Sequence, residues 1–182
     1  MPATTRVLIL PGWQNSGPMH WQSRWQALHG FERVQQADWD WPRRGDWMAQ
    51  LEAAVLADPR PTALVAHSLG CHLVAAWAAH SRHVAHITAA LLVAPPDTTR
   101  NDMPSLLSTW RAIARQRLPF PAVVVYSTDD PFCSIGRALA MAADWGAEAL
   151  SLGDKGHING DSGLGDWPEG LRCLRRFSGA EG

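Results

Sequence analysis

Ser68 carries the clearest chemical signature in the chain. It stands between an apolar run, Leu64-Val65-Ala66-His67, and the amphipathic segment that begins at Leu69. A strand that runs straight into a helix forces the serine between them into a strained turn, and its hydroxyl then projects from the top of the sheet. Small neighbours, Ala66 and Gly70, allow the strand and the helix to pack closely. This pattern predicts a nucleophile elbow for acyl transfer.

An ordinary helix N-cap is the alternative interpretation of Ser68, because serine often satisfies an unpaired N–H at a helix start. The G-x-S-x-G form is also incomplete, since Ala66 stands at its first glycine. The rest of the chain has to decide between the two.

A histidine base must follow the serine, because hydrolases built on this elbow carry serine, acid and histidine in that order. Of the eight histidines, seven lie at or before residue 86. Only His157 remains, in the glycine-rich stretch Gly153-Asp154-Lys155-Gly156-His157. A lone loop histidine is usually just solvated, but elimination makes His157 the base if Ser68 is the nucleophile.

The acid is expected after the β-branched run at 121–126, which reads as a buried strand. Asp129 and Asp130 follow it. Asp130 is the preferred residue because Pro131 biases it toward an extended backbone, whereas Asp129 fits a solvated turn position. In this arrangement His157 takes the proton of Ser68, and Asp130 holds the imidazole tautomer.

The oxyanion of acyl transfer needs preorganised N–H donors. Leu69, directly after the serine, is expected to supply one of them. The second is expected from the loop at 11–17, where Trp13 is the preferred donor and Gln14 the alternative. Gln14 and the loop residues Trp13 and Trp41 are also candidates for the substrate pocket, while Trp21 and Trp25, at helical spacing, favour packing.

Other site chemistries find little support. Gly12 and Gly17 have phosphate-loop spacing, but Pro18 and Met19 stand where lysine and serine or threonine would be needed. The histidines at 67, 72, 80, 83 and 86 lack metal-ligand partners and read as surface or helix-packing residues. No cofactor and no metal are expected.

Composition favours one compact intracellular domain over residues 1–182. The net charge of −1 and pI of about 6.7 give no sign of a nucleic-acid or membrane partner. No leader or spanning segment is recognisable, and three unpaired cysteines fit a reducing compartment. We therefore expect a cytoplasmic enzyme acting on a small-molecule acyl substrate. Protein partners remain open.

Apolar strand-like runs alternate with helical patterns, which predicts an α/β sandwich with a mostly parallel sheet of about six strands. The expected strands are 6–10, 33–37, 62–66, 89–93, 121–126 and 147–150. The expected helices are 18–29, 46–57, 69–80, 104–114, 134–144 and 168–177. All proposed catalytic residues then follow the carboxyl ends of strands.

Four motifs in order resemble the small serine hydrolases related to retinoblastoma-binding protein 9, a YdeN-like group: Pro11-Gly12-Trp13 with His20-Trp21, the elbow, Asp130-Pro131-Phe132 and Gly156-His157-Ile158-Asn159. The resemblance implies an α/β-hydrolase fold without a large lid and a triad of Ser68, Asp130 and His157. The L-x-C-x-E peptide is missing, because Leu73 stands at its last position, so retinoblastoma binding is not implied.

Two functions follow. The first is hydrolysis of small carboxylic esters or related acyl substrates through an acyl-serine. The second is a binding or regulatory protein that keeps the fold without turnover. A short insert at 95–104 is expected to wall an open, shallow site.

Overall fold

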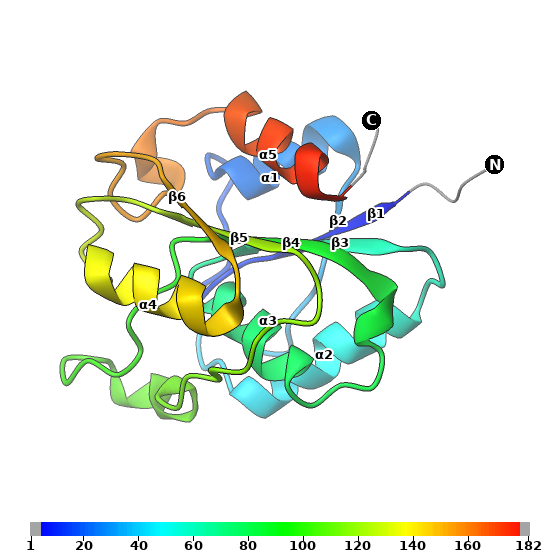
Figure 1. Ribbon diagram of the computed structural model, residues 1–182, viewed down its shortest axis with the longest axis horizontal. Coiled ribbons are helices and arrows are strands. Elements are labelled where there is room, and N and C mark those ends of the chain that lie inside the picture. Colours follow the sequence, from blue (N-terminus) through cyan, green and yellow to red (C-terminus); the bar gives the residue numbers. More distant parts are fainter. Residues whose placement is uncertain (1–4, 179–182) are drawn as a thin grey trace.

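A parallel sheet organises the computed structural model, which describes residues 5–178. Within that range six strands lie in the order β2-β1-β3-β4-β5-β6 (Figure 1). All five pairings are parallel. The sheet confirms the predicted fold class. The strands are β1 (Arg6–Leu10), β2 (Glu32–Arg33), β3 (Thr62–His67), β4 (Ile87–Val93), β5 (Ala122–Tyr126) and β6 (Glu148–Ser151).

Helices cover both faces of the sheet. Helices α1 (Trp21–His29) and α5 (Pro168–Ser178) lie on one face, and α2 (Arg44–Leu56), α3 (Leu69–Ala78) and α4 (Ile135–Trp145) lie on the other (Figure 1). Two buried apolar clusters fill the layers between sheet and helices. The central strands are buried on both faces, which explains why their sequences are continuously apolar instead of alternating.

Tryptophan side chains pack α1 against the start of α5. Trp21 and Trp25 are almost fully buried, and the Trp25 ring stacks on Trp167 at 5.7 Å between centroids. The helix-packing interpretation of Trp21 and Trp25 is therefore confirmed.

Two predicted elements differ from the structure. The helix expected at 104–114 is a short 3-10 helix, Ser105–Trp110. A long-range contact fixes its end, because the Trp110 indole N–H donates to the Pro42 carbonyl. The strand expected at 33–37 is only Glu32–Arg33, because only these two residues of the stretch are paired with β1 at the edge of the sheet. Two more short 3-10 helices, Val84–His86 and Gly160–Ser162, complete the elements.

None of the helices in the described range is long and apolar enough to cross a membrane.

Candidate active site

The turn at Ser68 has the strained backbone expected of a nucleophile elbow. Its φ is +54° and its ψ −123°, a conformation that a serine rarely adopts. Ser68 occupies the N-cap position of α3, but its side chain makes no capping hydrogen bond to the helix, so capping does not account for the serine there. Gly70 is required for the close packing, because a Cβ there would lie 2.3 Å from the Leu10 carbonyl oxygen.

Ser68, His157 and Asp130 form one hydrogen-bonded chain. The Ser68 Oγ lies 2.8 Å from His157 Nε2, and His157 Nδ1 lies 3.0 and 3.1 Å from the two carboxylate oxygens of Asp130. A carboxylate only accepts, so Nδ1 carries the proton and Nε2 is free to accept from the serine hydroxyl. The His157 side chain is 12% exposed and that of Asp130 3% exposed.

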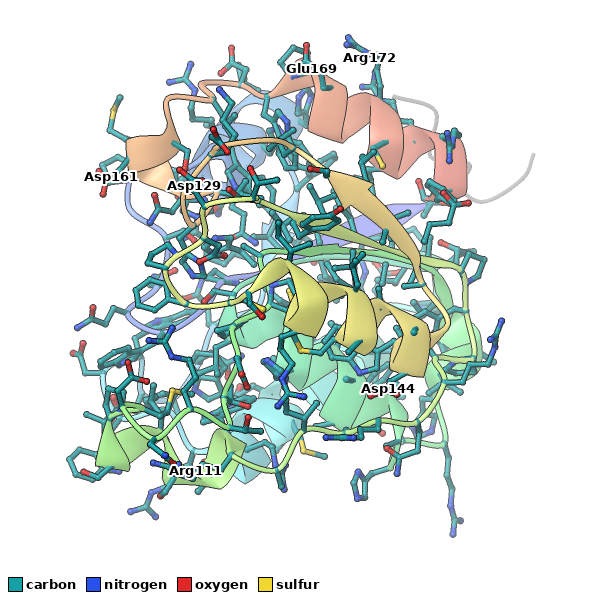
Figure 2. The ribbon with its side chains drawn as sticks, turned by 60° about the vertical axis from the view of Figure 1, so that its left-hand side comes forward. Arg111, Asp129, Asp144, Asp161, Glu169 and Arg172 are labelled. Carbon is teal, nitrogen blue, oxygen red and sulfur yellow. The ribbon has the colours of Figure 1, made fainter. Side chains whose placement is uncertain are left out.

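Asp129 supports the backbone of the same loop. Its Oδ1 accepts hydrogen bonds from the Ser127 hydroxyl and from the Gly156 N–H, each at 2.7 Å. These bonds, the one from Ser127 foremost, hold the pKa of Asp129 below its ordinary value. The structure thus separates the neighbouring acids: Asp130 meets the His157 ring, and Asp129 ties the β5 loop to the His157 loop. Asp129 lies with Asp161 at the same end of the molecule (Figure 2).

The loop after β1 passes directly over the serine. A Cβ on Gly12 would lie 2.8 Å from the Ser68 Cβ and 3.2 Å from the Leu69 nitrogen, so only glycine allows this approach. The Gln14 N–H donates to the Trp39 carbonyl at 3.0 Å. The Trp13 indole N–H donates to the Asp40 carbonyl at 3.0 Å, but over residues 5–178 no hydrogen bond from the Trp13 backbone N–H is seen. Of the two alternatives, Trp13 is thus the one whose N–H is available.

A cavity of about 450 Å³ opens at this point. Part of its lining is apolar and includes Trp13, Leu69, Met103, Pro104, Leu107 and Phe132. Another part is polar and includes Gln14, Asn15, His20 and Asn159. Trp41 is not among the lining residues. It is 55% exposed, because the Asp38 carboxylate caps the turn at 40–41 and leaves the ring on the surface.

The insert after β4 forms one wall of the cavity and is fixed to its surroundings. The Asp97 N–H donates to the Phe132 carbonyl at 2.9 Å, and the Asp97 carboxylate pairs with Arg137 at 3.2 Å. The Arg100 guanidinium donates to the Pro131 carbonyl and to Asp102, at 2.5 Å each. The contacts with Pro131 and Phe132 bind the insert to the loop that carries Asp130, and the Arg137 pair binds it to α4.

The cysteines near the site are not poised as nucleophiles. Burial raises the pKa of the Cys71 thiol well above its ordinary value. Burial, followed by the charge of Asp130, raises the pKa of Cys133 to about 12. Since the thiolate is the reactive form, neither residue competes with Ser68.

Two buried histidines escaped the sequence analysis. His67 and His20 are each 5% exposed and lie against the His157 segment, whereas the sequence pattern placed His67 on a surface or in helix packing. No local spacing reveals the pair, because its members are 47 residues apart. His72, in contrast, packs on Trp145 as expected.

The sheet order, the elbow after β3 and the cavity at the carboxyl ends of the strands define an α/β-hydrolase fold. The serine hydrolase family model matches residues 7–176, and the chain therefore belongs to the serine hydrolase family. No curated protein sequence matches this chain.

Solved structures agree with this assignment. A hydrolase from Pectobacterium atrosepticum described as YdeN-like is 27% identical, with a TM-score of 0.85 over 97% of this chain and 91% of that one. The YdeN protein of Bacillus subtilis is 20% identical, with a TM-score of 0.74 over 96% and 98% of the two chains. An esterase from a Rhodococcus species shares the fold at 13% identity, with a TM-score of 0.68 over 98% and 92%.

Proposed function

We propose that this hydrolase cleaves small carboxylic esters or closely related acyl substrates through an acyl-Ser68 intermediate. The observation that carries the proposal is the continuous hydrogen-bonded chain from Ser68 Oγ through the His157 ring to Asp130. A binding protein without turnover has no need to keep a strained serine aligned with a histidine base.

Each group has a defined task in the proposed reaction. His157 Nε2 takes the hydroxyl proton as Ser68 Oγ attacks the carbonyl carbon, and Asp130 stabilises the imidazolium that forms. The N–H groups of Leu69 and Trp13 receive the oxyanion. His157 then returns the proton to the leaving group. Water, deprotonated by the same imidazole, releases the acid and restores the serine.

The cavity favours a compact acyl group. Its apolar wall, which includes Met103, Leu107 and Phe132, suits a short hydrocarbon chain, and a volume of about 450 Å³ holds a small ligand. The insert at the cavity wall is tied down by Arg100 and Arg137. We therefore expect acetyl and butyryl esters to be cleaved with higher kcat/KM than long-chain esters.

The test is hydrolysis of p-nitrophenyl acetate, butyrate and octanoate by the wild type and by Ser68→Ala. Turnover of the short esters that falls to near background in Ser68→Ala is expected. The matched control is Ser81→Ala, which removes a serine hydroxyl remote from the cavity and should keep full activity. Equal turnover by Ser68→Ala and the wild type would overturn the proposal, and a strong preference for octanoate would overturn the substrate class.

A further inference from the structure

Two histidines outside the Ser68–His157–Asp130 chain connect the helix α1 start to the His157 loop. His20 Nε2 lies 3.3 Å from His67 Nδ1, and His67 Nε2 lies 2.8 Å from the carbonyl oxygen of His157. The ring centroids of His67 and His157 are 5.0 Å apart. His67 immediately precedes Ser68, so this contact joins the segment of the serine to the segment of the histidine.

The hydrogen bonds in this connection can run in only one direction. The Gln22 N–H donates to His20 Nδ1 at 3.1 Å, so that nitrogen carries no proton. His20 Nε2–H then donates to His67 Nδ1, which leaves the proton of the neutral His67 ring on Nε2. The His157 carbonyl accepts it. A backbone donor at one end and a backbone acceptor at the other therefore fix both rings in the Nε2–H tautomer.

Charge and burial agree with two neutral rings. Burial, followed by the charges of Arg33 and His157, lowers the pKa of His20 to about 3. Burial also lowers the pKa of His67 well below its ordinary value, with His20 and His157 adding to the effect. A proton added to either acceptor nitrogen would face an N–H that points at it.

The connection ends on a carbonyl, which accepts a hydrogen bond and passes no proton to the His157 ring. Its effect is on position. The next carbonyl along the chain, that of Ile158, accepts from the Trp21 indole N–H at 2.9 Å. Ile158 is fully buried with a φ of +48°, and such a strained backbone persists only where its surroundings hold it. Two consecutive carbonyls are thus held from β3 and α1.

We propose that His67, supported by His20, is a positioning residue that holds the His157 backbone so that the imidazole meets Ser68. The inference rests on the proposed hydrolase function. His67 acts by aligning the His157 base and makes no contact with the reacting atoms.

Four variants test this assignment by kcat and KM on p-nitrophenyl acetate. His67→Phe keeps a ring and removes the donor to the His157 carbonyl, whereas His67→Gln keeps an N–H donor near the same place. His20→Asn keeps an acceptor for the Gln22 N–H and removes the donor to His67. His29→Asn, at the exposed end of the same helix, is the matched control.

We expect His67→Phe to lower kcat about 10- to 100-fold, because a displacement of about 1 Å at a catalytic group can cost that much. Both rings lie at the cavity wall, so KM is the readout that separates a positioning residue from a substrate contact. A positioning role predicts a KM within about twofold of the wild type. His67→Gln should recover most of the loss, and His20→Asn should show a smaller loss in the same sense. His29→Asn should match the wild type. The 15N signals of both imidazoles should report the neutral Nε2–H tautomer at neutral pH.

Wild-type kcat in folded His67→Phe and His20→Asn would overturn the inference while the hydrolase function stands. A higher KM with unchanged kcat would overturn it as well, since that would make His67 a substrate contact. If His67→Phe does not fold, His20→Asn decides by the same criteria. A wild type that neither turns over esters nor reacts with a fluorophosphonate would overturn the proposed function itself, and the inference with it.

Discussion

At the carboxyl ends of the strands, Ser68, His157 and Asp130 stand in a row with the histidine in the middle. A second cluster of serine, histidine and carboxylate lies near the amino end of β4, between α2 and the end of α3. There the carboxylate of Glu52 is in the middle: it accepts from Ser81 at 2.8 Å and from His83 at 2.6 Å.

The order of the groups sets their chemistry. In the β4 cluster Glu52 also accepts from the Trp77 indole N–H. Burial raises the pKa of Glu52, but hydrogen bonds from His83, Ser81 and Trp77 outweigh it and lower the pKa overall. Among residues 5–178, the acceptor of the Ser81 hydroxyl is the Glu52 carboxylate, and a carboxylate of low pKa is a weak base.

Exposure separates the two clusters further. The side chains of His83 and Glu52 are 42% and 30% exposed, against 12% for His157 and 3% for Asp130. Partners that are shielded from water interact more strongly than exposed ones. A serine, a histidine and a carboxylate, Asp130 in one cluster and Glu52 in the other, thus form a candidate catalytic centre in one place and a surface hydrogen-bond cluster in the other.

The largest expected effect comes from replacing the histidine of the candidate active site, with the histidine of the β4 cluster as the comparison. His157→Gln should lower kcat on p-nitrophenyl acetate by a factor on the order of 10⁶, because the serine loses its base. His83→Gln should leave kcat unchanged, since its partner is Glu52. Steady-state kinetics measure both. Comparable losses in the two variants would erase the distinction between the clusters.

The next effect concerns the two neighbouring acids. Asp130→Asn should lower kcat by about 10⁴-fold, because the wrong imidazole tautomer then faces Ser68. Asp129→Asn should cost far less, since the Asp129 carboxylate accepts from the Gly156 N–H and the Ser127 hydroxyl and not from the His157 ring. A greater loss of kcat in Asp129→Asn than in Asp130→Asn would reverse the assignment of the acid.

Gly12→Ala tests the expected oxyanion donors beside Ser68. The added methyl would press on Ser68 and displace the loop that presents the Trp13 N–H. Loss of one such donor costs about 100-fold or more in kcat. Kinetics alongside a thermal melt separate this effect from unfolding. Full activity in a folded Gly12→Ala would place the second donor elsewhere.

The smallest expected effect is on the pH dependence of the free energy of unfolding. The buried histidines and the Glu52 carboxylate change it over different pH ranges. Burial lowers the pKa of His20 to about 3 and of His72 to about 4, and it lowers that of His67 as well. The unfolded chain takes up these protons below pH 6.5 and the folded chain does not, so stability is complete above pH 6.5 and falls as the pH drops. The lowered pKa of Glu52 contributes stability that is complete above its ordinary pKa of 4.5 and is lost as the pH falls below it.

Urea unfolding at pH 7 and pH 5 measures this loss. His20 and His72 should each contribute about 2 kcal/mol between these two values, and His67 should act in the same direction. His72→Phe removes one proton site, and the difference between the two pH values should shrink by that amount. A pH dependence that is the same in His72→Phe and in the wild type would show that His72 takes up no extra proton on unfolding.

Much of the fold could be predicted because local pattern decides it. The strand at 6–10 coincides with β1, and the helix at 168–177 falls one residue short of α5. The 3-10 helix Ser105–Trp110 could not be predicted, because its form depends on the contact between Trp110 and Pro42. Long-range packing overrode helical spacing there.

The candidate site also has residues that the sequence predicts and residues that it does not. Ser68, Asp130 and His157 could be selected because chain order and strand ends constrain them, and the structure brings all three together. The role of His67 and His20 could not be predicted, since the two rings come into contact only when α1 packs beside β3. The sequence places Trp41 in the pocket because it is close along the chain to the predicted site. Closeness along the chain does not determine which way the turn at 40–41 directs the Trp41 ring.

The most direct test of the account is the site of reaction with a fluorophosphonate probe, located by peptide mass spectrometry. The account predicts one adduct on Ser68 of the wild type, none on Ser81, and no adduct on Ser68 in His157→Gln at the same exposure. An unlabelled folded wild type, or an adduct on Ser81 in place of Ser68, would contradict it.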